Sequence, residues 1–170
     1  MHFERYLLSL IPTWYFYHLM EYIVHTLSHN RKYGSYIYRA HLKHHKVYPI
    51  SQFTAKLPFK YSKIVGIPET FCVYFPFIVI ITIGFNLLLP YDLFIFVCSE
   101  TYLLLFISDY IHTQIHIDGS WLETYPTFMK LRKYHYLHHL RRSKNMSLSG
   151  LDTIYDQLFD TYYLPIQQFC

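Results

Sequence analysis

"FCVYFPFIVIITIGFNLLL", residues Phe71–Leu89, contains nineteen residues and no charged side chain. A helix of this length rises about 1.5 Å per residue and measures about 28 Å, close to the roughly 30 Å hydrocarbon core of a bilayer. After "PYD" at Pro90–Asp92, a second apolar block runs from Leu93 to Tyr110, in which only Glu100 and Asp109 are charged. The two blocks predict a membrane hairpin.

A third apolar block, Tyr6 to Val24, is weaker because it carries His18 and Glu21. The basic residues are unevenly placed: of fifteen Lys and Arg, eight lie between Arg31 and Lys63 and six between Lys130 and Lys144. The positive-inside rule places both basic segments in the cytosol. The loop between the hairpin blocks has no basic residue and is expected on the other side.

The predicted fold class is therefore an all-α integral membrane protein with about three transmembrane helices and a cytosolic histidine-rich helical cap. By length the chain, residues 1–170, is a single domain. We expect the membrane helices at about 6–24, 71–89 and 93–110. The cap would comprise residues 25–65 and 112–163.

Ten of the twelve histidines fall in four clusters, and all four lie on the predicted cytosolic side. Two clusters read H-x-x-x-H and two read H-x-x-H-H. On a helix, positions i, i+3 and i+4 lie on one face, so each cluster presents its imidazoles to one side. The clusters are His25 and His29; His41, His44 and His45; His112 and His116; and His135, His138 and His139.

A structural alternative is a cationic face of His, Lys and Arg that binds anionic lipid. That alternative explains the basic residues but not the register of the histidines. With twelve histidines in 170 residues, H-x-x-H-H arises by chance roughly 0.06 times per chain on an independence estimate. H-x-x-x-H alone is uninformative, whereas two copies of H-x-x-H-H favour a built site. His2 is expected on the surface.

Ten converging imidazoles indicate two metal ions, because one ion rarely takes more than six ligands. Imidazole suits iron, zinc, copper and nickel. A structural zinc site needs only four ligands, and a transporter would place ionisable groups near the bilayer midplane. The remaining task is oxidation of an unactivated C–H bond, which needs redox metals. We therefore expect two iron ions as cofactor, although zinc can occupy the site in purified material.

The order of the four clusters around a membrane hairpin resembles the fatty acid hydroxylase/sterol desaturase superfamily of membrane di-iron oxidases. Further matching segments are "EYIVH" (Glu21–His25), "HTQIHIDGSWLE" (His112–Glu123), "YHYLHH" (Tyr134–His139) and "NMSLSGLDTIYDQLFDTYY" (Asn145–Tyr163). The family's tail typically reads D-x-x-F-G-T, and here Asp160 replaces the glycine. The first pair has the spacing of sterol-type members, whereas "DYIHTQIH" is similar to the fatty acid 2-hydroxylases, so the subfamily stays open.

The resemblance implies a membrane-bound oxygenase that uses dioxygen to hydroxylate a fatty acyl chain, sphingolipid or sterol. Desaturation on the same centre is the alternative, and the sequence does not separate the two. It further implies a separate electron-donor protein of cytochrome b5 type or similar, no nucleic acid partner, and a multi-pass location in the endoplasmic reticulum membrane with a cytosolic active site. Two other classes compete with this one: a non-enzymatic metal-binding or transport membrane protein, and an inactive family member.

Three polar residues are candidates to support the ligands. Glu21 and Asp109 could each accept the free N–H of a ligand histidine, or serve only in helix capping and packing. Asn145 is a candidate partner of the site through water. His18 is expected to be a buried, hydrogen-bonded histidine rather than a ligand.

The C-terminal segment shows an apolar stripe at helical spacing, which predicts an amphipathic helix packing over the histidine clusters. The aspartates between the apolar residues are expected to form a solvated edge. The stripe comprises Leu151, Ile154, Tyr155, Leu158, Phe159 and Tyr162, and the edge comprises Asp152, Asp156 and Asp160.

Overall fold

A computed structural model describes residues 3–32, 35–56, 68–147 and 153–165. Within these ranges the chain forms six α-helices and two short 3-10 helices, with no strand. The predicted all-α class is confirmed. His2 and the predicted apolar position Leu151 lie outside the described residues.

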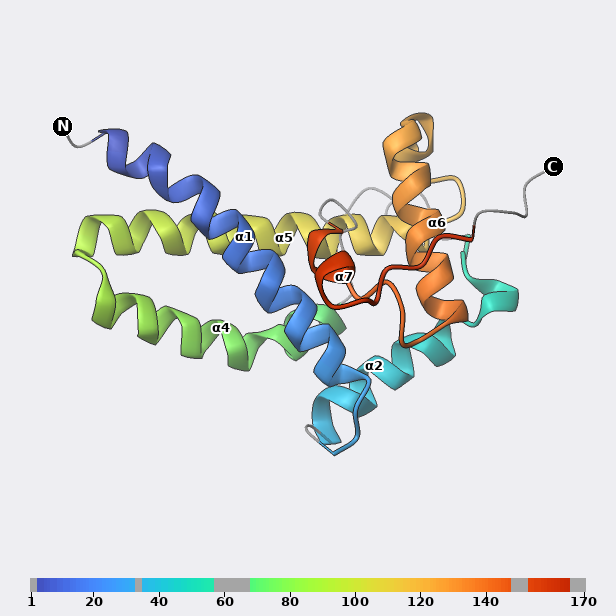
Figure 1. Cartoon of the computed structure of the whole chain (residues 1–170). Helices are drawn as coiled ribbons and strands as arrows, with labels where there is room; N and C mark the ends of the chain where they lie inside the picture. The colour runs from blue at the N-terminus through green and yellow to red at the C-terminus, as the bar shows by residue number, and fades with distance from the viewer. Residues whose placement is uncertain (1–2, 33–34, 57–67, 148–152, 166–170) are drawn as a thin grey trace.

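Three long helices, α1 (Phe3–Ser28), α4 (Pro68–Leu88) and α5 (Tyr91–Ile115), form the elongated part of the molecule (Figure 1). α4 and α5 make a hairpin at Pro90, which has no N–H to continue a helix and stands immediately before the first turn of α5. α1 packs against this hairpin through a buried apolar cluster. Its members are Tyr17, Val24, Tyr74, Ile78 and Leu105.

Among the described residues, α5 is the one helix that is long and apolar enough to cross a membrane, and Tyr74–Leu88 forms a shorter apolar helix. α1 begins beside the hairpin turn, where Arg5 pairs with Asp92 and the Tyr6 hydroxyl donates to the same carboxylate at 2.6 Å. α1 and α5 therefore start together and both run away from the turn (Figure 1).

The shorter helices α2 (Ser35–Val47) and α6 (Pro126–Leu140) lie toward the end opposite the hairpin turn (Figure 1). The short helix α7 (Ile154–Leu158) lies beside α1. The 3-10 helices η1 (Ile50–Gln52) and η2 (Trp121–Thr124) lie in the connections. η1 leads to an isolated parallel bridge between Ala55 and Ile117, directly after α5. This bridge joins the segment after α2 to the end of α5.

The C-terminal segment differs from its prediction. Its helix covers only Ile154–Leu158, and the side chains of Leu158 and Phe159 are exposed. Asp156 is fully buried instead, so the prediction of a solvated aspartate edge is wrong at this position. The physical reason is a set of hydrogen bonds to distant residues, which an apolar periodicity does not reveal.

Candidate metal centre

The ten clustered histidines converge from four helices at the end of the molecule opposite the hairpin turn. His25 lies in the last turn of α1 with His29 just beyond it, and His112 lies in the last turn of α5, which His116 caps. The H-x-x-H-H triplets lie in α2 and α6. Neighbouring rings from different helices have centroids 4.2 to 5.2 Å apart in many pairs, for example His45 with His139 and His29 with His45.

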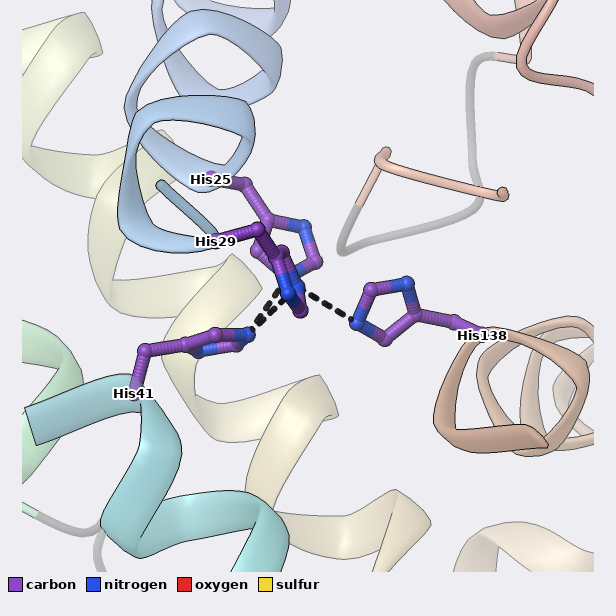
Figure 2. A group of neighbouring side chains, drawn as sticks. All are labelled: His25, His29, His41 and His138. Atoms are coloured by element: carbon purple, nitrogen blue, oxygen red, sulfur yellow. Dashed lines mark hydrogen bonds between the residues drawn. The ribbon is translucent and has the colours of Figure 1, made fainter. Parts of the chain in front are cut away.

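One set of nitrogens gathers around His41. His25, His29, His41 and His138 each offer a nitrogen within 4.8 Å of all the others, and Figure 2 shows these nitrogens turned toward one another. His29 Nε2 lies 2.8 Å from His41 Nε2 and 3.1 Å from His138 Nε2. His45 Nε2 lies 3.0 Å from His41 Nε2 and 3.3 Å from His138 Nε2. We call these five residues site A.

A second set gathers around His135. His44, His116, His135 and His139 also offer nitrogens within 4.8 Å of one another. His135 Nε2 lies 3.1 Å from Nε2 of both His116 and His139, and His112 Nε2 lies 3.1 Å from it as well. We call His44, His112, His116, His135 and His139 site B.

The partition follows the helical spacing. In each H-x-x-H-H triplet the i and i+4 histidines join one site, and the i+3 histidine joins the other. Site A thus takes the pairs of α1 and α2 with His138 of α6. Site B takes the pairs of α5 and α6 with His44 of α2. The two triplets are therefore shared between the sites, and the two H-x-x-x-H pairs are not.

Backbone carbonyls fix the tautomer of four of these rings. A carbonyl oxygen only accepts, so each of the four Nδ1 atoms carries the proton and the neutral ring directs the Nε2 lone pair into the site. In site A, His25 donates to Met146 O at 2.5 Å and His138 donates to Lys144 O at 2.8 Å. In site B, His116 donates to Phe53 O at 2.8 Å and His139 donates to Tyr48 O at 2.9 Å.

Burial keeps the rings neutral. It lowers the pKa of His41, His44, His135 and His138 well below the usual value. It also lowers the pKa of His29 and His139 to about 3. Neutral imidazoles cannot all donate to one another, so lone pairs face each other in both sites. Such an arrangement is unfavourable unless a cation occupies the space between them.

The nitrogen geometry fits a metal ion. Nitrogens bound at about 2.1 Å and at roughly 90–110° from one another lie about 3.0–3.4 Å apart. The Nε2–Nε2 contacts described above range from 2.8 to 3.3 Å. Each site can therefore hold one ion with little rearrangement. The donor set is all imidazole, which suits iron and zinc.

Comparison with known families supports this chemistry. The family model described as fatty acid hydroxylase matches residues 10–161, which include all ten histidines. The chain belongs to the fatty acid hydroxylase family. Membership implies an oxidoreductase and confirms the resemblance seen in the sequence. Neither the curated proteins nor the solved structures gave a match to this fatty acid hydroxylase family member.

The three candidate supporting residues occupy different places. Glu21 is buried on α1, with its oxygens 3.4 Å from the Tyr17 hydroxyl and from His18 Nδ1, and it interacts electrostatically with His112. Asp109 is half-buried one turn before His112. Their roles as partners of ligand histidines stay predictions. His18 is buried beside Glu21 and belongs to neither site.

Asn145 is fully buried, and its side chain bonds to two other segments of the chain. Its role as a partner of the site through water stays a prediction. Its side-chain NH2 donates to Tyr134 O at 3.2 Å and to Tyr163 O at 2.9 Å, and its Oδ1 accepts from Tyr163 N at 2.7 Å. Asp156, which accepts from Met146 N next to Asn145, was not among the candidates predicted from the sequence. Its position in the segment Asn145–Tyr163, which resembles the family, is the signal that points to it.

Proposed function

We propose that this chain is a membrane-bound oxygenase that hydroxylates a lipid chain or sterol, using two iron ions, dioxygen and electrons from a separate donor protein. Desaturation of the same class of substrate on the same centre is the alternative outcome. The observation that carries the proposal is the division of ten neutral imidazoles into two sites with inward-facing nitrogens. Bound iron would supply the dioxygen chemistry that side chains lack.

The protein's own residues would hold the two ions, orient the ligand rings and shield the metal centre. Carbonyls of residues 48, 53, 144 and 146 fix four ligand rings so that they are already oriented before an ion binds. An open pocket of about 380 Å³ borders site A, with His29, His41 and His45 in its wall beside Arg142. This pocket offers a route for small reactants from the polar side to site A.

The membrane topology is part of the proposal. We infer three crossings at about 6–24, 71–89 and 93–110, with the cap, residues 25–65 and 112–163, in the cytosol. Large apolar side chains are exposed along all three long helices, as lipid-facing surfaces require. They include Leu8 and Ile11 of α1, Ile80 and Leu87 of α4, and Leu103 and Phe106 of α5. The endoplasmic reticulum is the proposed membrane.

The test is mass spectrometry of total lipids from cells that express the chain. The comparison variant carries His135→Ala and His138→Ala, which removes one ligand from each site. A His2→Gln variant is the matched control, because it removes a histidine outside all four clusters. We expect a new hydroxylated or unsaturated lipid with the wild type and the control only. The same lipids from all three chains would refute the enzymatic proposal.

A further inference from the structure

Three consecutive residues, Lys144, Asn145 and Met146, contact ligands from two of the three helices that supply site A. The carbonyl of Lys144 accepts from His138 of α6, and the carbonyl of Met146 accepts from His25 of α1. Both bonds reach Nδ1, so both orient a ring whose Nε2 faces site A. This short turn therefore sets the relative position of two ligands that are far apart in the sequence.

The turn depends on an unusual backbone conformation. Asn145 has φ of 55°, in the left-handed region that Asn adopts more readily than most residues. Its side chain is bonded to Tyr134 and Tyr163, and its own N–H donates to Thr161 O at 2.8 Å. These contacts hold the turn between α6 and the C-terminal segment.

A buried carboxylate organises the far side of the turn. Asp156 accepts four hydrogen bonds: from Met146 N at 2.6 Å and the Thr161 hydroxyl at 2.6 Å on one oxygen, and from Ser147 N at 2.9 Å and the Tyr134 hydroxyl at 2.6 Å on the other. Two carboxylate oxygens offer about four lone-pair positions, so the acceptor capacity of Asp156 is filled. The side chain is fully buried.

The bond to Ser147 N leads directly to the ligand. The N–H of Ser147 and the C=O of Met146 belong to one planar peptide group and point in opposite directions. The N–H side of this peptide donates to Asp156 and its C=O side accepts from His25. The carboxylate therefore fixes the peptide plane and strengthens its carbonyl as an acceptor. A stronger acceptor at Nδ1 makes the Nε2 of His25 a better ligand.

We propose that Asp156 is a positioning residue for the ion in site A. The two carbonyls that orient site B rings belong to Tyr48 and Phe53. The four hydrogen bonds of the Asp156 carboxylate go to other residues. Loss of the carboxylate should therefore weaken one of the two ions selectively. The inference rests on the proposed two-metal function, since it assigns a support to one of the two ions.

The test is metal binding by the purified full-length chain in detergent. Zinc is titrated against a chelator to obtain two dissociation constants, and cobalt is used as a spectroscopic probe of the ligand set. Asp156→Asn replaces one acceptor oxygen by an NH2 group that faces hydrogen-bond donors. The matched control is Asp160→Asn, because Asp160 is an exposed aspartate four residues later. We expect Asp156→Asn to weaken one ion about 10–100-fold and leave the other unchanged. The control should bind both ions like the wild type.

Tyr134→Phe is the second variant, because it removes one of the four bonds and keeps the ring. It should weaken the same ion several-fold, and it decides the question if Asp156→Asn does not fold. The inference would be overturned if the folded variant bound both ions like the wild type. It would also be overturned if the variant bound both ions equally weakly. Lipid turnover does not enter this measurement. A wild-type chain that binds two ions but makes no lipid product would thus refute the proposed function and leave the inference standing.

Discussion

Replacement of Ala55 by proline should disturb site B and leave site A intact. Ala55 N donates to His116 O at 2.9 Å, and Ala55 O accepts from Asp118 N at 3.1 Å, which makes the bridge directly after α5. Two residues earlier, Phe53 O accepts from His116 Nδ1. The bridge thus keeps the carbonyl of Phe53 against a ligand ring. Proline removes the N–H of this bridge and keeps its carbonyl.

The expected size follows from that bond. A buried carbonyl that loses its hydrogen-bond partner costs about 1–3 kcal/mol. His116 is almost fully buried, so this cost applies to its carbonyl. If this loss of about 2 kcal/mol falls on metal binding, the affinity of site B for its ion decreases roughly 30-fold. Ala55→Val is the control, because valine keeps the N–H and suits an extended conformation.

Chelator competition with zinc measures both ions, and denaturant unfolding of the same samples measures stability. We expect one weakened ion in Ala55→Pro and two unchanged ions in Ala55→Val. If Ala55→Pro retained both dissociation constants and its unfolding midpoint, the bridge would have no part in orienting His116. If valine weakened the site as much as proline, side-chain packing rather than the hydrogen bond would be responsible.

Three further outcomes are expected. Asp160 has φ of 54°, so Asp160→Gly should relieve left-handed strain and raise the free energy of unfolding by about 0.5–1 kcal/mol; a lower value in denaturant titration would contradict this. In the chelator-stripped chain, His29 and His139 have a pKa of about 3 when folded and about 6.5 when unfolded. The unfolded state then binds more protons, so stability should fall as pH drops from about 6.5 toward 3, and a flat pH profile would argue against buried neutral rings. Arg132 donates to Glu123 at 2.6 Å and to two backbone carbonyls; Arg132→Met should cost about 2–3 kcal/mol in unfolding, and Arg132→Lys should recover less than half of it because an ammonium cannot form the fork.

The sequence predicted what depends on local spacing. The register of His41, His44 and His45 places three rings on one face of a helix, and the structure finds them in α2 among rings from α1, α5 and α6. The apolar run of Phe71–Leu89 likewise predicted a helix where α4 lies. Both predictions need only helical geometry and the cost of burying charge.

What the sequence could not predict depends on contacts between distant segments. Asp156 lies in a pattern of three aspartates spaced four apart, which is typical of a solvated helix face. Its burial follows from bonds to Tyr134, Met146 and Ser147, and no local periodicity encodes these. The role of the Tyr48 and Phe53 carbonyls could not be predicted either. Every residue has a carbonyl, and only the fold determines which carbonyls accept a hydrogen bond from a histidine ring.

Each H-x-x-H-H triplet gives ligands to both sites. Substitutions of the backbone supports should therefore distinguish the binding of the two ions better than substitutions of the ligand histidines. α2 gives His41 and His45 to site A and His44 to site B, and α6 gives His138 to site A and its other two histidines to site B. A substitution at His44 or His138 therefore acts on a helix that also serves the other site. We expect such a substitution to weaken the binding of both ions. The supports of the rings are not shared in this way: the turn around Asn145 orients only site A rings, and the segment Tyr48–Phe53 orients only site B rings. A variant of either support should thus weaken the binding of its own ion and leave the binding of the other unchanged.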